Sequence, residues 1–231
     1  MLKFLMKCDL HVHTFYSYDS TALPKEMVDA ALKKGVDCLA ITDHGEIQGA
    51  LDATNYASNK PILIIPGIEI KTKEGDVLGL NIKEKIPNGI SAKETIGLIK
   101  EKGGIAIIPH PFALFYPFKG NLKKLLKEID GIEVLNASVI GSGNKKALDF
   151  AKNHNIPFIA GSDAHFPNFI GKTYLEIPEK NLTIEEILEA IKNRDCKVGG
   201  KEAGFFEKTI DHLKRNLAKI EYHVARKKRK V

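Results

Sequence analysis

Short apolar segments alternate with segments of helical periodicity along this chain. The expected strands are residues 38–42, 62–70, 77–82, 105–108, 132–135, 157–160 and 173–177, after a first strand that ends near residue 13. The expected helices are residues 24–34, 48–58, 91–102, 122–129, 145–153, 183–192 and 205–226. Continuous apolar strands separated by helices predict a parallel sheet that is buried on both faces. About seven such units without an obvious linker favour a closed or nearly closed α/β barrel over an open sheet.

Size and composition are those of a soluble globular chain. The 231 residues are 43% hydrophobic and 28% charged, enough for one large core or two small ones. The sequence has no apolar run long enough to cross a bilayer, and its first residues are charged too early for a secretory signal peptide. We therefore expect a cytoplasmic protein with no membrane partner. The cysteines, Cys8, Cys38 and Cys196, form no C-x-x-C pair and are expected to be buried thiols.

The net charge of +6 is compatible with an anionic ligand or with nucleic acid. Much of the excess lies in the basic residues 226–230. A charge run at a chain end is more often solvated than engaged, so a nucleic-acid partner is not favoured.

Metal-binding residue types follow the expected strands, where each strand leads toward the next helix. On a strand, the alternation of Asp9, His11 and His13 with apolar residues places these three side chains on one face. The other residues in such positions are His44, Glu69, His110, Asp163 and His165. In a barrel of parallel strands these positions meet at the carboxyl end, where sites are built. Helix capping or a rigid turn could explain any one of them, but not their shared position, so we expect a metal site.

The motifs that carry these residues resemble those of the PHP family, named for polymerase and histidinol phosphatase domains. In order, they are Asp9-Leu-His11-Val-His13-Thr14-x-x-Ser17-x-Asp19, Thr42-Asp43-His44-Gly45, Gly67-Ile-Glu69, Pro109-His110-Pro111, Gly131-Ile-Glu-Val-Leu-Asn136 and Gly161-Ser-Asp163-Ala-His165. The resemblance implies the PHP fold, a distorted (β/α)7 TIM-like barrel. It implies one PHP domain over residues 1–231, with metal motifs at 7–165 and a helical closure with the basic tail at 201–231.

The resemblance also implies two to three divalent metal ions. The first would be held by His11, His13, Glu69 and Asp163. Glu69 would bridge to a second, which His110 also binds. The third would be held by Asp19, His44 and His165. Catalytic roles are implied for Asp19, His44, Asp163 and His165.

Three further residues are expected around these ligands. Asp9 and Asp43 suit the support of ligands, or equally the capping of a helix or turn. Asn136 stands where related sequences often have His. Either its side-chain carbonyl is a weak ligand, or a water molecule takes the ligand position. Histidine and carboxylate ligands without thiolate suit Zn, Mn or Fe, and the sequence does not choose among these metals.

The expected function is a metal-dependent phosphoesterase that hydrolyses a phosphomonoester or a short nucleotide phosphate by a metal-activated water. One alternative is a histidinol-phosphate phosphatase, with Phe115, Tyr116 and Phe118 forming either a pocket wall or the small core of a loop. The other is a non-catalytic RNA-binding subunit resembling the ribonuclease P barrel protein. Candidate phosphate-binding lysines are Lys119, Lys172 and Lys201. The sequence leaves the oligomeric state open.

Overall fold

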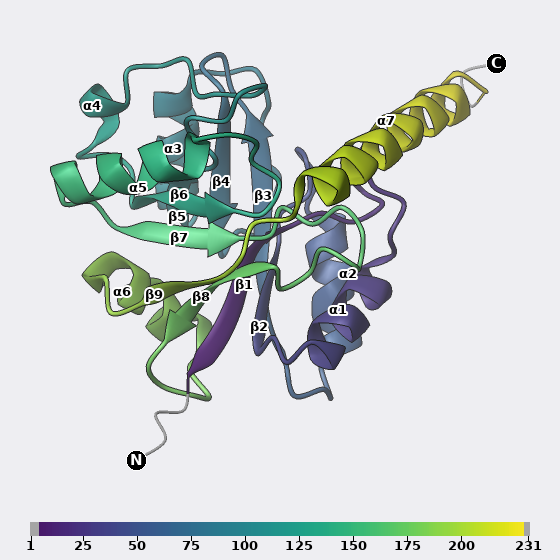
Figure 1. Ribbon diagram of the computed structural model, residues 1–231, viewed down its shortest axis with the longest axis horizontal. Helices are drawn as coiled ribbons and strands as arrows, with labels where there is room; N and C mark the ends of the chain where they lie inside the picture. The colour runs from purple at the N-terminus through teal and green to yellow at the C-terminus, as the bar shows by residue number, and fades with distance from the viewer. Residues whose placement is uncertain (1–4, 229–231) are drawn as a thin grey trace.

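A mixed sheet of nine strands, in the order β7-β6-β5-β4-β3-β2-β1-β8-β9, curls into a nearly closed barrel in this computed structural model (Figure 1). The structure describes residues 5–228. The strands are β1 (Met6–Val12), β2 (Cys38–Ile41), β3 (Leu63–Lys71), β4 (Asp76–Leu80), β5 (Ile105–Ile108), β6 (Gly131–Asn136), β7 (Phe158–Gly161), β8 (Thr173–Ile177) and β9 (Lys197–Gly200). The predicted α/β barrel is confirmed.

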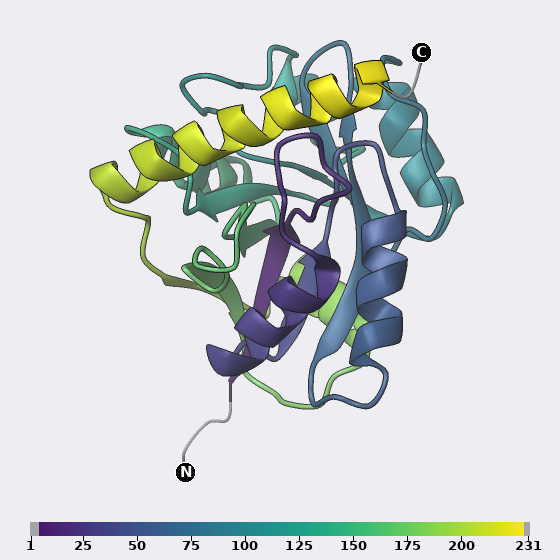
Figure 2. The ribbon, with the colours of Figure 1, turned by 90° about the vertical axis from the view of Figure 1, so that its right-hand side faces the viewer.

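Helices cover the outside of the barrel. They are α1 (Pro24–Lys33), α2 (Gln48–Ala57), α3 (Ala92–Glu101), α4 (Leu122–Leu125), α5 (Gly143–His154), α6 (Ile184–Asn193) and α7 (Phe205–Lys228). One apolar cluster lies beneath α1 and α2, another beneath α3, α4 and α5, and a third includes α6. Helix α7 packs instead across the barrel mouth, and its carboxyl-terminal part projects from the body (Figures 1 and 2). Within residues 5–228, no helix has the length and apolarity to traverse a bilayer.

The sheet departs from the expected parallel arrangement at β4, β8 and β9, which pair antiparallel. Only residues 72–75 join β3 to β4, with Gly75 at φ 141°. A parallel crossover needs about a dozen residues, so this turn can only reverse the chain. Strand β9 was not predicted, because Lys-Val-Gly-Gly lacks an apolar run. Helix α4 is shorter than predicted, and only turn-type hydrogen bonds continue it to Ile129.

The basic tail is described only in part. Helix α7 ends at Lys228, and residues 229–231 lie outside the described residues. The prediction of a solvated tail is therefore not tested there.

Two backbone hydrogen bonds draw β1 against the chain that follows β7. The Asp163 amide donates to the His11 carbonyl at 2.8 Å, and the His13 amide donates to the Ala164 carbonyl at 2.8 Å. This contact closes the barrel at its carboxyl end. It also requires a glycine, because a Cβ on Gly161 would lie 2.4 Å from the Cβ of His11.

We predict that Gly161→Ala destabilises the fold by about 2 kcal/mol, because the extra methyl group overpacks the β1–β7 contact. Urea unfolding followed by circular dichroism measures the loss. Gly97→Ala is the matched control, since nothing lies within 4 Å of that added Cβ in α3. It should stabilise the protein by roughly 0.5–1 kcal/mol, as Gly→Ala does in an exposed helix. Equal effects of the two substitutions would contradict the close approach.

Candidate metal centre

The carboxylate of Glu69, on β3, lies among imidazoles that come from separate strand ends. Glu69 Oε2 is 2.9 Å from His44 Nδ1, 3.3 Å from His13 Nε2 and 3.5 Å from His11 Nε2. Glu69 Oε1 is 3.4 Å from His110 Nε2. The predicted convergence of strand ends therefore occurs, with Glu69 where a bridging ligand would lie.

Asp163 and Asp19 complete the cluster on either side. Asp163 Oδ1 lies 3.4 Å from His13 Nε2 and 3.8 Å from His11 Nε2. Asp19 Oδ1 lies 3.1 Å from His165 Nε2 and 3.5 Å from His44 Nε2. All the predicted ligands are thus in one cluster, and within residues 5–228 its ligand atoms form three groups, each within 4.8 Å. These groups are His11–Glu69–His110, His11–His13–Asp163 and His13–His44–His165.

The cluster has the donor set and the unpaired atoms that suit divalent cations. The Nε2 atoms of His11 and His13 face each other at 3.0 Å. Among the described residues, the buried atoms Asp19 Oδ1, Glu69 Oε1 and His165 Nε2 have neighbours but none oriented for a hydrogen bond. Buried polar atoms are rarely left unpaired. Nitrogen and oxygen ligands without thiolate fit Zn, Mn or Fe, so the residues fit the implied ions.

Glu133 contacts two of the candidate ligands, and sequence reasoning did not single it out. Its Oε1 lies 3.1 Å from His11 Nδ1, and its Oε2 accepts from the His110 amide at 2.9 Å. A carboxylate at Nδ1 holds the proton there and leaves Nε2 free to bind a metal. The available signal was a charged residue inside the apolar run of β6, in a motif already recognised.

Asn136 contacts Glu133, not an imidazole. Its side-chain amide donates to Glu133 Oε2 at 2.9 Å, and its Oδ1 accepts from the Ser138 amide at 2.8 Å. Both ends of the side chain are therefore engaged, which favours the supporting role over weak ligation.

Asp9 and Asp43 each act one contact away from the ligands. Asp9 accepts from the amides of Ser162 and Gly171, both at 2.8 Å, and so fixes the segment that carries Asp163; burial raises the pKa of Asp9 to about 6. Asp43 accepts from Ser17 Oγ at 2.8 Å, and that hydroxyl lies 3.0 Å from His13 Nδ1. Neither carboxylate contacts an imidazole directly.

Two residues of the cluster have strained backbones. His110 has φ 30° and Asp163 has φ 52°, a region that residues with a Cβ seldom adopt. Such conformations persist at functional sites because the surrounding structure enforces them.

The carboxylates and imidazoles of the cluster shift one another's pKa values. Burial disfavours the charged form of His110, but Glu69 outweighs it and raises the pKa of His110 to about 9. Glu69 and Asp19 raise the pKa of His44 in the same way against burial. Burial, together with neighbouring His165 and His44, holds the pKa of His13 well below its usual value. A cation that binds His44 or His110 competes with the proton that each raised pKa favours, so cation affinity rises with pH.

A cavity of about 840 Å³ opens above the cluster. Its wall includes the aromatic residues Tyr18, Phe115 and Tyr116, and Tyr18 stacks on His44 with ring centroids 4.8 Å apart. Of the three predicted loop aromatics, Phe115 and Tyr116 line the cavity, whereas Phe118 is buried in the apolar cluster beneath α3, α4 and α5.

Cations surround this cavity, and α7 supplies two of them. The lining cations are Lys71, Lys73, Lys119, Arg215 and Lys219. Of the lysines predicted to bind phosphate, only Lys119 is in this lining. Lys172 instead pairs with Glu207 at 2.9 Å. Arg215 and Lys219 were not predicted as site residues, because no motif surrounds them in α7.

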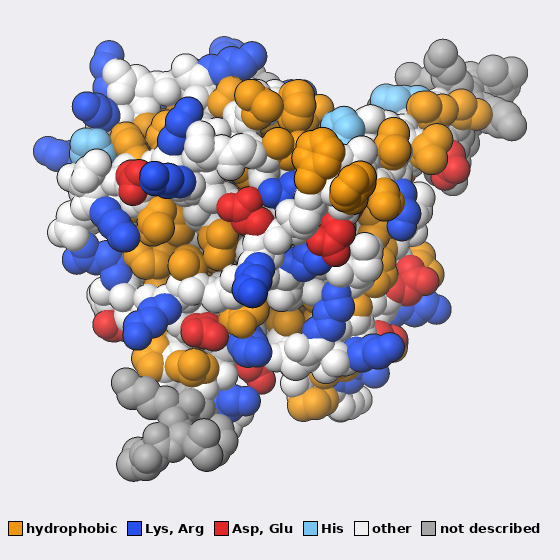
Figure 3. All heavy atoms as spheres, viewed as in Figure 1, with side chains coloured by type: hydrophobic (Ala, Val, Ile, Leu, Met, Phe, Trp, Pro, Cys, Tyr) orange, Lys and Arg blue, Asp and Glu red, His pale blue; other side chains and the backbone are white. Residues whose placement is uncertain are grey.

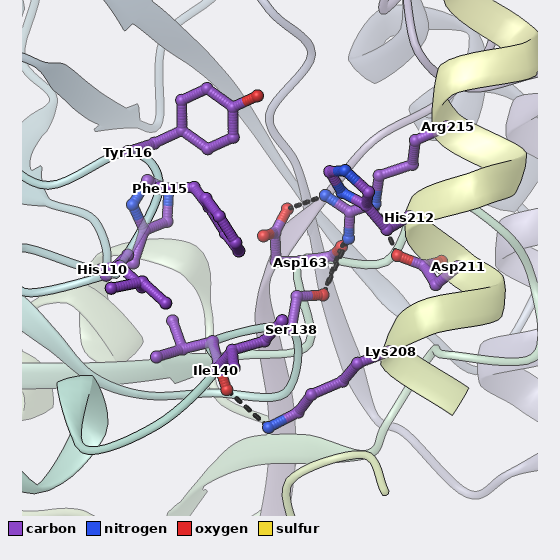
Figure 4. A pocket seen from close by; sticks show the side chains of 13 residues that line it. His110, Phe115, Tyr116, Ser138, Ile140, Asp163, Lys208, Asp211, His212 and Arg215 are labelled. Carbon is purple, nitrogen blue, oxygen red and sulfur yellow. Dashed lines mark hydrogen bonds and ion pairs between the residues drawn. The ribbon is translucent and has the colours of Figure 1, made fainter. Parts of the chain in front are cut away.

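Arg215 joins α7 to the cluster in a smaller pocket beside the cavity (Figure 4). Its guanidinium donates to Asp211 at 2.6 Å, and to Ser138 Oγ and the Asp163 carbonyl at 2.7 Å. Its Nη1 lies 3.6 Å from Asp163 Oδ1, so Arg215 restrains the strained Asp163.

The family profile described as PHP-associated matches residues 141–196. An uncharacterized protein of Methanocaldococcus jannaschii is 39% identical over 142 residues, which are 57% of this chain and 82% of that protein. The chain belongs to the PHP family.

Two other similarities cover more of this PHP protein. A probable phosphatase of Thermoanaerobacter is 27% identical over 96% of both chains. The crystal structure of a two-domain protein from Bacteroides vulgatus, which contains a predicted PHP-like metal-dependent phosphoesterase, superposes with a TM-score of 0.73. It has 22% identity, and the match covers 92% of this chain and 70% of that one, which shows a shared fold.

We predict that Glu133→Gln weakens Mn²⁺ or Zn²⁺ binding about 10- to 100-fold, the usual loss when a supporting carboxylate is replaced. The new amide group must face either His11 Nδ1 or the two donors at Oε2, and both arrangements lose a hydrogen bond. Isothermal titration calorimetry measures the affinity. Glu128→Gln is the control, because Glu128 pairs only with exposed Lys93 among the described residues. Unchanged affinity in Glu133→Gln would refute the supporting role.

Proposed function

We propose that this protein is a metal-dependent phosphoesterase that hydrolyses a phosphomonoester or a short nucleotide phosphate. The observation that carries the proposal is the position of the ligand cluster, at the floor of a cavity lined with cations. The similarity to a probable phosphatase and to a phosphoesterase-containing structure supports the same chemistry.

The ligand residues would hold two or three divalent ions, Zn, Mn or Fe. Such ions lower the pKa of water toward neutrality and neutralise charge on phosphate oxygens. Asp19, His44, Asp163 and His165 are the proposed catalytic residues, because all of them line the cavity and would hold the ions there.

The residues of the chain would bind and orient the ester. Lys219 lines the cavity with its Nζ 3.7 Å from Asp19 Oδ2, so it can contact a phosphate oxygen beside the ligands. Tyr18 and Tyr116 offer flat apolar surface in the same cavity, which suits a ring such as a nucleobase. The volume is within the range of small-molecule sites and exceeds what a phosphate group alone would fill.

We predict that hydrolysis depends on bound metal. The purified protein, loaded with Mn²⁺ or Zn²⁺, should release phosphate from an aryl phosphate or from nucleotides. Removal of the ions by a chelator should reduce the rate by at least about 100-fold, because charge stabilisation and water activation are both lost. Added Mn²⁺ should restore it.

The proposal would be refuted if the chelator left the hydrolysis rate unchanged, or if the metal-loaded protein hydrolysed none of the esters. Preference for histidinol phosphate would favour the phosphatase alternative. Salt-dependent RNA binding without turnover would favour the RNA-binding alternative.

We also predict that Lys219→Ala raises KM about tenfold and changes kcat less, because a binding contact at the cavity edge is lost. Steady-state kinetics on the best ester measures both constants. Lys192→Ala is the control, since Lys192 is exposed on α6 and outside the cavity lining. Equal effects of the two substitutions would contradict a phosphate contact by Lys219.

A further inference from the structure

Helix α7 packs on the barrel with its polar side and leaves an apolar side in solvent. Toward the body, Lys208 bonds to Glu202 at 2.9 Å, Arg215 to Ser138 at 2.7 Å, and Ala218 is buried. The opposite side is apolar and 48–80% exposed at Phe206, Ile210, Leu213, Leu217, Ile220 and Val224, which we call the α7 stripe. A surface helix normally buries its apolar side, so this arrangement is inverted.

The spacing of the α7 stripe is that of a coiled-coil seam. Its members are separated alternately by four and three residues from Phe206 to Val224. Such a narrow stripe suits one facing helix with the same repeat. The hydrophobic side chains of this projecting helix are visible in Figure 3.

We propose that the α7 stripe is the interface of a homodimer, in which α7 of a second copy packs antiparallel along it. A twofold axis near the middle of the stripe makes the seam self-complementary. The apolar pairs across the axis are then Phe206–Val224, Ile210–Ile220 and Leu213–Leu217. Burial of the stripe on both copies would remove roughly 1,200 Å² from water, which reaches the range of specific interfaces.

Charged residues beside the α7 stripe favour a second copy of α7 as the partner, packed antiparallel. One flank carries Glu207, Lys214 and Glu221, which alternate in sign. Helical side chains lean toward the helix amino terminus, so in an antiparallel pair Lys214 approaches Glu221 of the partner subunit, twice by symmetry. A parallel pair would set this flank against the other, which is uncharged at Thr209 and Asn216.

A lipid surface fits the stripe less well. Helices that lie on membranes carry Lys and Arg along the polar border of the apolar face. Here the acidic Glu207 and Glu221 interrupt one border, and Thr209 and Asn216 occupy the other.

The mass in solution tests the proposal. Light scattering after gel filtration, from about 1 to 100 µM because dimers depend on protomer concentration, should give twice the 25.6 kDa of one chain. Leu213→Glu with Leu217→Glu should give one chain's mass throughout, because charge enters the seam. Leu23→Glu on exposed Leu23 outside α7 should remain dimeric. Circular dichroism and metal content verify folding of each variant.

Charge reversal tests the orientation. Lys214→Glu should weaken association about tenfold, by replacing attraction with repulsion at a close charge pair. Adding Glu221→Lys should restore it, whereas the lost contact of Lys214 with the Phe166 ring would not be restored. A monomeric wild-type chain, a dimer that survives the double stripe variant, failure of the charge swap, or binding of the monomer to anionic vesicles would each overturn the proposal.

Discussion

The contact of one buried carboxylate with several imidazoles underlies the arrangement of this protein. Glu69 lies within 3.5 Å of His11, His13, His44 and His110. Burial opposes the charge on Glu69, but His44 and His11 hold its pKa well below the usual value. Burying such charges costs several kcal/mol unless geometry and partners compensate. Divalent cations between these side chains would supply that compensation, and the strained backbones of His110 and Asp163 are then explained by the positions that their ligand atoms must reach.

The sequence predicted those strands and helices that have a clear apolar pattern or a capping signal. Strands such as β2 and β5 are continuous and buried, and the capping boxes at Ser91 and Thr183 mark the helix starts of α3 and α6. Strand direction could not be predicted in this way, because a buried antiparallel strand such as β4 has the same apolar pattern as a parallel one. Strand β9 pairs with the edge of β8. This pairing depends on the tertiary structure, so the local sequence did not predict the strand.

The site could be predicted where chemistry follows a strand end. His44 and His110 stand out in short motifs, and the structure brings them to the same carboxylate. Glu133 was missed because its role depends on the neighbouring strand, which sets His11 beside it. Arg215 was missed because α7 crosses the mouth through polar contacts, so its periodicity indicates the solvent side and not the side that faces the cluster.

Two of the cations that line the cavity come from a part of the chain that contributes none of the candidate ligands. Every candidate ligand lies between His11 and His165, as do the lining lysines Lys71, Lys73 and Lys119, whereas Arg215 and Lys219 reach the cavity from α7. The loop segment 115–119, which carries Tyr116, contributes cavity wall and none of the candidate ligands, whereas Arg215 of α7 bonds to the Asp163 carbonyl at 2.7 Å. The wall of the cavity can therefore change through the Tyr116 segment while the candidate ligand cluster keeps its geometry, whereas a change at Arg215 alters both.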